Sequence, residues 1–228
     1  MKISIIIPAY NEAANIERLV NYLLNQTKDK SVEIIVVDGG SNDETIERAK
    51  KAGALVYSSP ENGRAAQMNY GANFAKSNIL YFVHADSYPP PGFVSDIIKA
   101  VSDGFKIGRY QTKFDSPSRL LKLNAFFTRF DIFMCYGGDQ TLFITKDLFT
   151  KLTGFDSRMQ VMEEYDLVQR ARPLSRYKIF SAKALVSARK YERNSWWKVQ
   201  KANYAMIRLF KKGTPQIQML TTYKKMLN

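Results

Sequence analysis

The sequence predicts an α/β fold in which a mixed, mostly parallel sheet is flanked by helices. Over the first 104 residues, short β-branched apolar segments alternate with longer segments whose apolar residues have helical spacing. Glycine and proline separate the two kinds of segment, as is typical of the connections in such a fold. The 228 residues are 45% hydrophobic, which is enough for a domain with its own core.

Strands and helices are expected in strict alternation through the first half of the chain. Residues 3–7 are short, apolar and β-branched, and Pro8 ends them, which predicts a buried strand. Behind them, Ile16, Leu19 and Leu23 share one helix face. The same reasoning predicts strands beginning at 33, 54 and 78, a helix that Ser41 or Asn42 caps and that runs to 52, and a helix over 63–77.

The second half of the chain is less regular. Residues 106–114 are compatible with a strand, and residues 117–136 are aromatic and helix-like. A glycine-rich loop and a strand follow over 136–145, and a short helix after them is stopped by Gly154. The acid-rich segment "MEEYDLVQRAR" begins another helix.

The charge of the chain is concentrated at its C-terminal end. The net charge is +13, and residues 176–228 carry 13 Lys and Arg against one acid, Glu192. We therefore divide the chain into a domain at 1–175, with halves at about 1–104 and 105–175, and a basic helical extension at 176–228. Trp196, Val199, Ile207 and Phe210 can share one helix face in this extension. Such a helix binds an anionic membrane surface, packs on the domain, or does both. Nucleic acid is the less attractive partner because no known nucleic-acid fold signature is present.

Residue counts restrict the cofactors and the location. One cysteine, Cys135, and one histidine, His84, exclude an internal disulfide and a zinc site built from these residue types. A metal ion would need oxygen ligands, which favours Mg²⁺ or Mn²⁺. No stretch approaches the roughly 20 apolar residues of a membrane span. We expect a cytoplasmic protein, free or peripheral on the inner face of the membrane.

Polar clusters follow three of the expected strands. They are residues 9–12 ("AYNE"), residues 38–41 ("DGGS") and residues 84–86 ("HAD"). The carboxyl ends of parallel strands meet at one edge of the sheet, where ligands bind in α/β folds. A P-loop and a G-x-G-x-x-G turn are both absent from the sequence, so a nucleotide would need another arrangement.

Each polar residue has both a functional and an ordinary structural explanation. Asp38 can accept hydrogen bonds from a base or ribose, or close a tight turn. Asp86 can hold a cation that bridges a diphosphate, or cap a helix. His84 can bind a ribose or a metal-bound water, or it can be a hydrogen-bonded packing residue. Arg64 can bind phosphate at a helix start, or it can be a solvated surface charge.

A further acidic cluster offers a general base. Glu163, Glu164 and Asp166 crowd one helix start, where a carboxylate suits proton abstraction. The same acids would also complement the positive end of the helix dipole. Only the occurrence of all these groups in order, at expected strand ends, favours function.

In this order the motifs resemble family 2 glycosyltransferases of the GT-A fold. The resemblance covers residues 3–172 and is carried by "SIIIPAYNEAANI", "EIIVVDGGSNDET", "GRAAQMNYGANFA", "ILYFVHADS" and "GFDSRMQVMEEYDLVQRAR". "HADSYPPPGF", "YGGDQTLFI" and "SARKYERNSWW" resemble a bacterial subgroup associated with radical-SAM and selenium-domain proteins. The resemblance implies inverting, metal-assisted transfer of a hexosyl-like sugar from a nucleoside-diphosphate sugar.

The resemblance also implies roles for single residues. The residues expected to cradle the nucleotide are Pro8, Ala9, Tyr10, Glu12 and Asp38, with Asp43, Arg64 and His84 as further donor contacts. Asp86 matches the metal-binding carboxylate of the family's D-x-D motif. Glu164 or Glu163 matches the catalytic base. Gly137, Gly138, Asp139 and Gln140 would line the acceptor or sugar pocket.

The sequence departs from the family pattern at two positions. His84 stands where D-x-D has its first aspartate, and Glu164 stands where an aspartate base is expected. A non-catalytic module that binds a nucleotide sugar or a polyanion therefore remains an alternative. A nucleotidyltransferase is a third reading, but it would need a glycine-rich first loop that is absent. Short motifs do not identify the donor sugar, the nucleotide base or the acceptor, for which a lipid-linked molecule is one candidate.

Overall fold

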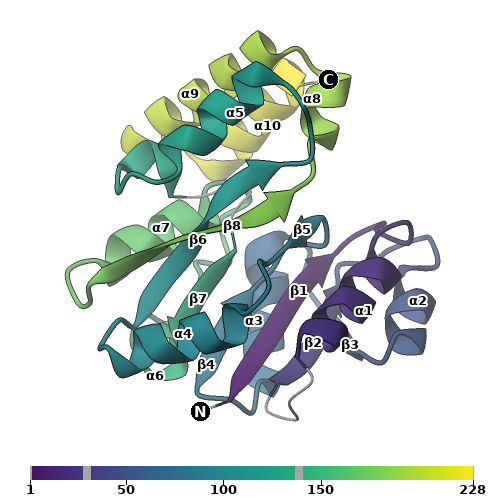
Figure 1. Ribbon diagram of the computed structural model, residues 1–228. Coiled ribbons are helices and arrows are strands. Elements are labelled where there is room, and N and C mark those ends of the chain that lie inside the picture. The colour runs from purple at the N-terminus through teal and green to yellow at the C-terminus, as the bar shows by residue number, and fades with distance from the viewer. Residues whose placement is uncertain (1, 28–31, 137–140, 228) are drawn as a thin grey trace.

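The computed structural model describes residues 2–27, 32–136 and 141–227, and these residues form an eight-stranded sheet flanked by helices (Figure 1). The strand order is β3-β2-β1-β4-β7-β6-β8-β5. Its first half consists of β1 (Ile3–Ala9), β2 (Val32–Asp38), β3 (Leu55–Ser58) and β4 (Ile79–Phe82), which are mutually parallel. The expected α/β fold with a mixed, mostly parallel sheet is confirmed.

The second half of the sheet mixes strand directions. It contains β7 (Leu142–Thr145), β6 (Ile107–Phe114), β8 (Tyr177–Val186) and β5 (Ser87–Tyr88). Strand β7 runs antiparallel to both of its neighbours, β6 and β8 are parallel, and the short β5 pairs antiparallel with the end of β8. The last pairing brings the segment after β4 against the segment after β8.

Helices cover both faces of the sheet because the strands alternate their side chains between two apolar layers. In β1, Ile5 and Ile7 belong to one buried cluster and Ile6 to the other. The first cluster includes side chains of α1 (Ile16–Gln26), α2 (Thr45–Lys51) and α4 (Phe93–Ser102). The second includes side chains of α3 (Arg64–Phe74), α6 (Lys146–Lys151) and α7 (Glu163–Ala171).

Gly71 lets α3 pack closely on the sheet. A Cβ atom at this position would lie 2.7 Å from Ile6 Cγ2 and 2.8 Å from Val37 Cγ2. Such contacts are too short for any real side chain, so the glycine is a packing requirement and does not interrupt the helix. The close packing fixes the start of α3, and with it Arg64, over the ends of β1 and β2.

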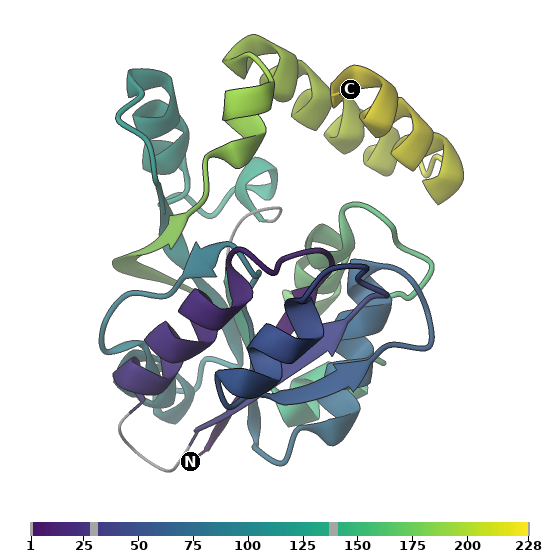
Figure 2. The same cartoon turned by 90° about the vertical axis from the view of Figure 1, so that its right-hand side faces the viewer.

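The C-terminal part corrects one expectation about secondary structure. Residues 177–186 lie in the segment expected to be helical, but they form β8 and pair with β6 along its length. The helices begin later, with α8 (Arg189–Arg193), α9 (Trp196–Lys211) and α10 (Gln216–Leu227). These helices, α5 (Arg119–Phe127) and the 3₁₀ turn η1 (Phe133–Cys135) lie at one end of the molecule (Figure 2).

Helix α9 shows which of its apolar residues pack inward. Val199 and Ile207, from the expected apolar face, are buried, whereas Trp197 and Tyr204 are exposed. Much of this face is therefore used for packing, which includes contacts between α9 and α10. The division of the chain into domains at 175 stays a prediction.

Candidate active site

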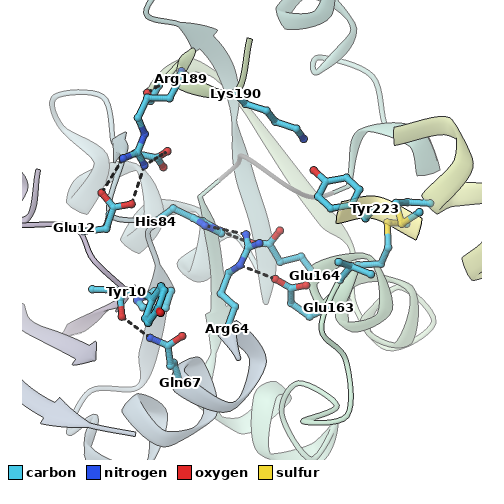
Figure 3. Close-up of a pocket in the computed structure, with 18 of the residues that line it drawn as sticks. Tyr10, Glu12, Arg64, Gln67, His84, Glu163, Glu164, Arg189, Lys190 and Tyr223 are labelled. Atoms are coloured by element: carbon cyan, nitrogen blue, oxygen red, sulfur yellow. Dashed lines mark hydrogen bonds and ion pairs between the residues drawn. The ribbon is translucent and has the colours of Figure 1, made fainter. Parts of the chain in front are cut away.

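A pocket of about 480 Å³ lies between the carboxyl ends of the central strands and the C-terminal helices (Figure 3). Nine of the residues expected at a functional site line it, and they come from the ends of β1 and β4 and the starts of α3 and α7. They are Pro8, Ala9, Tyr10, Glu12, Arg64, His84, Asp86, Glu163 and Glu164. Gly137, Gly138, Asp139 and Gln140 lie outside the described residues.

The loops after β1 and β2 are joined by side-chain hydrogen bonds. The backbone N–H groups of Glu12 and Ala13 donate to Thr45 Oγ1 and Asp43 Oδ2, at 2.8 and 3.1 Å. Asp38 is buried, and its Oδ2 accepts from the backbone N–H groups of Gly40 and Ser41. Asp38 and Asp43 thus shape the loops beside the pocket and do not line it.

The other carboxylate oxygen of Asp38 bears on its expected role. Asp38 Oδ1 is buried and has no hydrogen-bond partner within the described part of the chain. Buried polar atoms are usually satisfied, so this acceptor at a strand end is compatible with a donor group from a ligand. The expected nucleotide contacts of Asp38 and Asp43 stay predictions.

Gln67 is a pocket residue that sequence reasoning missed. Its Nε2 donates to the backbone oxygens of Ala9 and Val37, at 2.8 Å each, and so joins α3 to both β1 and β2. A helix face shared with Arg64, three residues earlier, was the available signal. Gln67 therefore fixes the strand ends on which the pocket is built.

Four charged or titratable side chains form one network in the pocket. Arg64 Nε lies 3.1 Å from Glu163 Oε1, and Arg64 Nη1 lies 3.2 Å from His84 Nδ1. His84 Nε2 lies 2.7 Å from Glu164 Oε1. Figure 3 shows the four side chains converging from α3, the end of β4 and the start of α7.

The two contacts of His84 select one neutral tautomer. A guanidinium only donates, so Nδ1 accepts from Arg64 and the proton on Nε2 is donated to Glu164. Burial by itself lowers the pKa of the His84 imidazole, but the charge and hydrogen bond of Glu164 raise it, and the net effect is a raised pKa. Protonation of Nδ1 requires Arg64 to turn away, because two donors would then face each other.

Glu163 and Glu164 are held at the positive end of α7. Both are buried, and they are the first two residues of the helix, where its dipole stabilises negative charge. Met162, immediately before them, has a φ of 68°, a left-handed conformation that a non-glycine residue rarely adopts. The backbone is therefore turned at this point so that both carboxyl groups reach the pocket.

Arg189, which sequence reasoning also missed, joins two of the expected site acids. Its guanidinium contacts both oxygens of Glu12, at 3.2 and 2.8 Å, and Asp86 Oδ2 at 3.1 Å. The hydrogen bond to Glu12, opposed by burial, raises the pKa of Arg189. The residue stands three positions after β8, and Ser187 N donates to Asp86 O at 3.1 Å, which fixes this segment beside the end of β4.

The side chains near Asp86 fit a divalent cation only in part. Mg²⁺ in nucleotide sites is often held by one or two carboxylates together with substrate phosphates, so one aspartate is sufficient in principle. However, Asp86 is paired with Arg189, and both ring nitrogens of His84 are engaged. Over residues 2–27, 32–136 and 141–227, no group of three or more His, Cys, Asp or Glu side chains is arranged to hold a metal ion.

The C-terminal helices form the side of the pocket opposite the sheet. Lys190, Asn203, Met206 and Tyr223 line it, and Lys190 Nζ lies 5.2 Å from the centre of the Tyr223 ring. None of them was expected at the site. The basic extension is thus part of the pocket wall, whatever else it binds.

Comparison with known sequences identifies related proteins. The model of the family described as "Glycosyl transferase family 2" matches residues 4–155. Dolichol-phosphate mannosyltransferase of Pyrococcus furiosus is 31% identical over 112 residues, which are 47% of this chain and 32% of that protein. An uncharacterized glycosyltransferase of Haemophilus influenzae is 25% identical over 182 residues, 73% of this chain and 60% of that one. The matches to several curated relatives thus span well under half of their length.

Comparison with solved structures shows the fold. The mannosyltransferase PcManGT from Pyrobaculum calidifontis, in complex with GDP-Man and Mn²⁺, has a TM-score of 0.71 at 16% identity, over 90% of this chain and 61% of that chain. S. aureus TarS in complex with UDP-GlcNAc has a TM-score of 0.67 at 20% identity, over 82% of this chain and 58% of that one. The chain therefore has the GT-A-type fold that its sequence motifs predict.

Proposed function

Because the chain belongs to glycosyl transferase family 2, we propose that it transfers a sugar from a nucleoside-diphosphate sugar to an acceptor hydroxyl with inversion at the anomeric carbon. The observation that carries the proposal is Glu164, a buried carboxylate that faces the pocket and is oriented by His84. A general base needs this placement, because it must be held within reach of the proton that it removes. The resemblance to the bacterial subgroup associated with radical-SAM and selenium-domain proteins is part of the proposal.

In the proposed reaction, the acceptor oxygen attacks the anomeric carbon on the face opposite the diphosphate. The carbon–oxygen bond to the diphosphate breaks, its electron pair stays with the leaving diphosphate, and the acceptor proton passes to Glu164. The His84 Nε2 proton holds the Glu164 carboxylate in place. Arg64, at the start of α3, supplies positive charge toward the leaving group.

Mg²⁺ or Mn²⁺ is proposed at Asp86, together with oxygens of the donor diphosphate. A bound cation would offset negative charge on the leaving group. In this chain, Asp86 Oδ2 accepts from Arg189 at 3.1 Å, so a cation would compete with Arg189 for this oxygen. The proposed partners are therefore a nucleotide-sugar donor and a divalent cation that enter together.

Donor binding gives the direct test of the proposed function. In a thermal-shift series, UDP, GDP and their sugars are added with and without MnCl₂, and we expect at least one nucleotide to raise the melting temperature in proportion to the logarithm of its concentration. Release of nucleoside diphosphate in the presence of acceptor mixtures then distinguishes an enzyme from the alternative, a non-catalytic nucleotide-sugar or polyanion-binding module. No shift with any nucleotide would contradict the proposal.

We further propose that the protein works at an anionic membrane surface on a lipid-linked acceptor. Among the helices of the described residues, none has the length and hydropathy of a membrane span. Seven large apolar side chains between residues 120 and 134 are 41–60% exposed. They are Leu120, Leu123, Phe126, Phe127, Phe130, Ile132 and Met134.

The charge around these seven side chains favours a lipid surface as their partner. Arg119, Lys122 and Arg129 are exposed among them, and the single acid in the same segment, Asp131, is paired with Arg172. Exposed aromatic and aliphatic groups bordered by basic residues suit the interface of an anionic bilayer. The C-terminal helices, which carry most of the net charge, stand at the same end of the molecule (Figures 1 and 2).

Co-sedimentation with vesicles tests the membrane surface. We expect the protein to bind vesicles of phosphatidylcholine with phosphatidylglycerol, but not phosphatidylcholine alone, with weaker binding at high salt. The double variant Phe126→Glu/Phe130→Glu should lose binding, whereas Leu24→Glu, an equally exposed site on α1, should keep it. The mass in solution is measured by light scattering as well. If the wild-type protein is a dimer and the double variant a monomer, these side chains form a subunit interface instead.

A further inference from the structure

Glu12 and Asp86 are joined by a single guanidinium, that of Arg189. Arg189 Nη2 lies 2.8 Å from Glu12 Oε1 and 3.1 Å from Asp86 Oδ2, so one nitrogen joins the two carboxylates. The three side chains line the pocket and are partly accessible, with 44% of the Arg189 side chain, 30% of Asp86 and 16% of Glu12 exposed. A ligand in the pocket can therefore reach this ion pair.

The backbone places Arg189 here independently of the ion pair. Val186 pairs with Ser87 in the β5–β8 ladder, and the Ser187 N–H donates to Asp86 O. Ala188 is buried. The backbone of Arg189, the first residue of α8, is thus anchored beside Asp86. Its long side chain can adopt other rotamers and contact other groups nearby.

A bound diphosphate would change which partner is best. The ion pair consists of two carboxylates and one guanidinium and therefore carries a net negative charge. A diphosphate that approaches it is repelled by this excess charge. Arginine binds phosphate oxygens, like carboxylates, through two parallel hydrogen bonds. A cation at Asp86 would remove the need for Arg189 at that carboxylate.

We propose that Arg189 is a diphosphate-binding residue of this site, and that it exchanges its contact with Asp86 for one with the donor diphosphate as the donor enters. The inference rests on the proposed function, because it assumes a nucleoside-diphosphate ligand. Its consequence is coupling. Mn²⁺ alone competes with Arg189 for Asp86 Oδ2, and the nucleotide alone approaches the carboxylates of Glu12 and Asp86. Each ligand therefore raises the affinity for the other by the same factor.

The test measures both ligands without turnover. Binding of UDP or GDP, whichever the thermal-shift series selects, is measured by calorimetry, and free Mn²⁺ by electron paramagnetic resonance. In the wild-type protein, we expect the nucleotide to tighten Mn²⁺ binding about tenfold or more. In Arg189→Gln, we expect nucleotide affinity in MnCl₂ to fall about tenfold, Mn²⁺ alone to bind more tightly than to the wild-type protein, and the coupling to shrink.

Matched variants separate charge from structure. Arg193→Gln removes the same charge from an exposed residue of the same helix and should change neither affinity. Arg189→Lys keeps a positive charge at the site and should retain most of the nucleotide affinity. Equal nucleotide affinity in wild type and Arg189→Gln, or an equal loss in Arg189→Lys and Arg189→Gln, would overturn the exchange. A wild-type protein that binds no nucleoside diphosphate would instead contradict the proposed function.

Discussion

Replacing Glu164 by glutamine is expected to lower the rate of sugar transfer by about 10²- to 10⁴-fold, the usual contribution of a general base. Glutamine keeps the shape and an oxygen that can accept from His84 Nε2, but it cannot take the acceptor proton. The loss should appear in kcat, while the dissociation constant of the donor changes little, because the proton moves only in the transition state. Single-turnover rates with saturating donor, and donor binding by calorimetry, measure the two quantities.

The neighbouring glutamate supplies the matched comparison. Glu163 is equally buried, but its carboxylate is held by the Arg64 guanidinium at 3.1 Å. Glu163→Gln should therefore act mainly through Arg64, with a smaller fall in kcat and a larger effect on donor affinity. Asp166→Asn changes a third acid of the same helix turn, one that pairs with Arg170, and should leave transfer nearly unchanged. A greater loss of kcat in Glu163→Gln than in Glu164→Gln would reverse the assignment of the base.

The strand ends could be predicted from the sequence because each cluster is local. The apolar run, its terminating turn and the polar residues after it are consecutive, so His84 and Asp86 could be placed at the end of β4 without coordinates. Their partners could not be placed in this way. Glu164 lies 80 positions from His84, and Arg189 lies 177 positions from Glu12. Pairings over such separations depend on the order in which the strands assemble into the sheet, and the periodicity of apolar residues does not encode that order.

The charge asymmetry of the chain also led to a wrong prediction for the residues of β8. Lys178 and Lys183 lie within β8, and counting charge alone assigned the whole segment to a basic helical tail. Alternation between buried and exposed side chains toward the end of β8 is the local signal of a half-buried strand. Because β8 delivers Arg189 to the pocket, the error in this element also hid the residue that contacts Glu12 and Asp86.

His84 should titrate above the ordinary histidine pKa of about 6.5 in the wild-type protein and below it in Glu164→Gln. In the wild type, burial lowers the pKa, but Glu164 outweighs it. Without the Glu164 charge, burial remains and the guanidinium of Arg64 also lowers the pKa, while Asp86 acts in the opposite direction. His84 is the one histidine of the chain, so ¹⁵N imidazole resonances followed against pH report on it without ambiguity.

The same shift of the His84 pKa predicts how stability depends on pH. A folded-state pKa above the unfolded value means that the His84–Glu164 pair contributes stability fully below the unfolded pKa, and that this contribution is lost as pH rises through the folded pKa. The stability lost in Glu164→Gln, measured by urea denaturation, should therefore be greater near pH 6 than near pH 9. Two results would contradict this prediction: a loss of stability that is greater at the higher pH, or an imidazole pKa that the substitution leaves unchanged. Either would mean that the Arg64 contact keeps His84 neutral over the whole pH range. His84 would then orient Glu164 only as a hydrogen-bond donor.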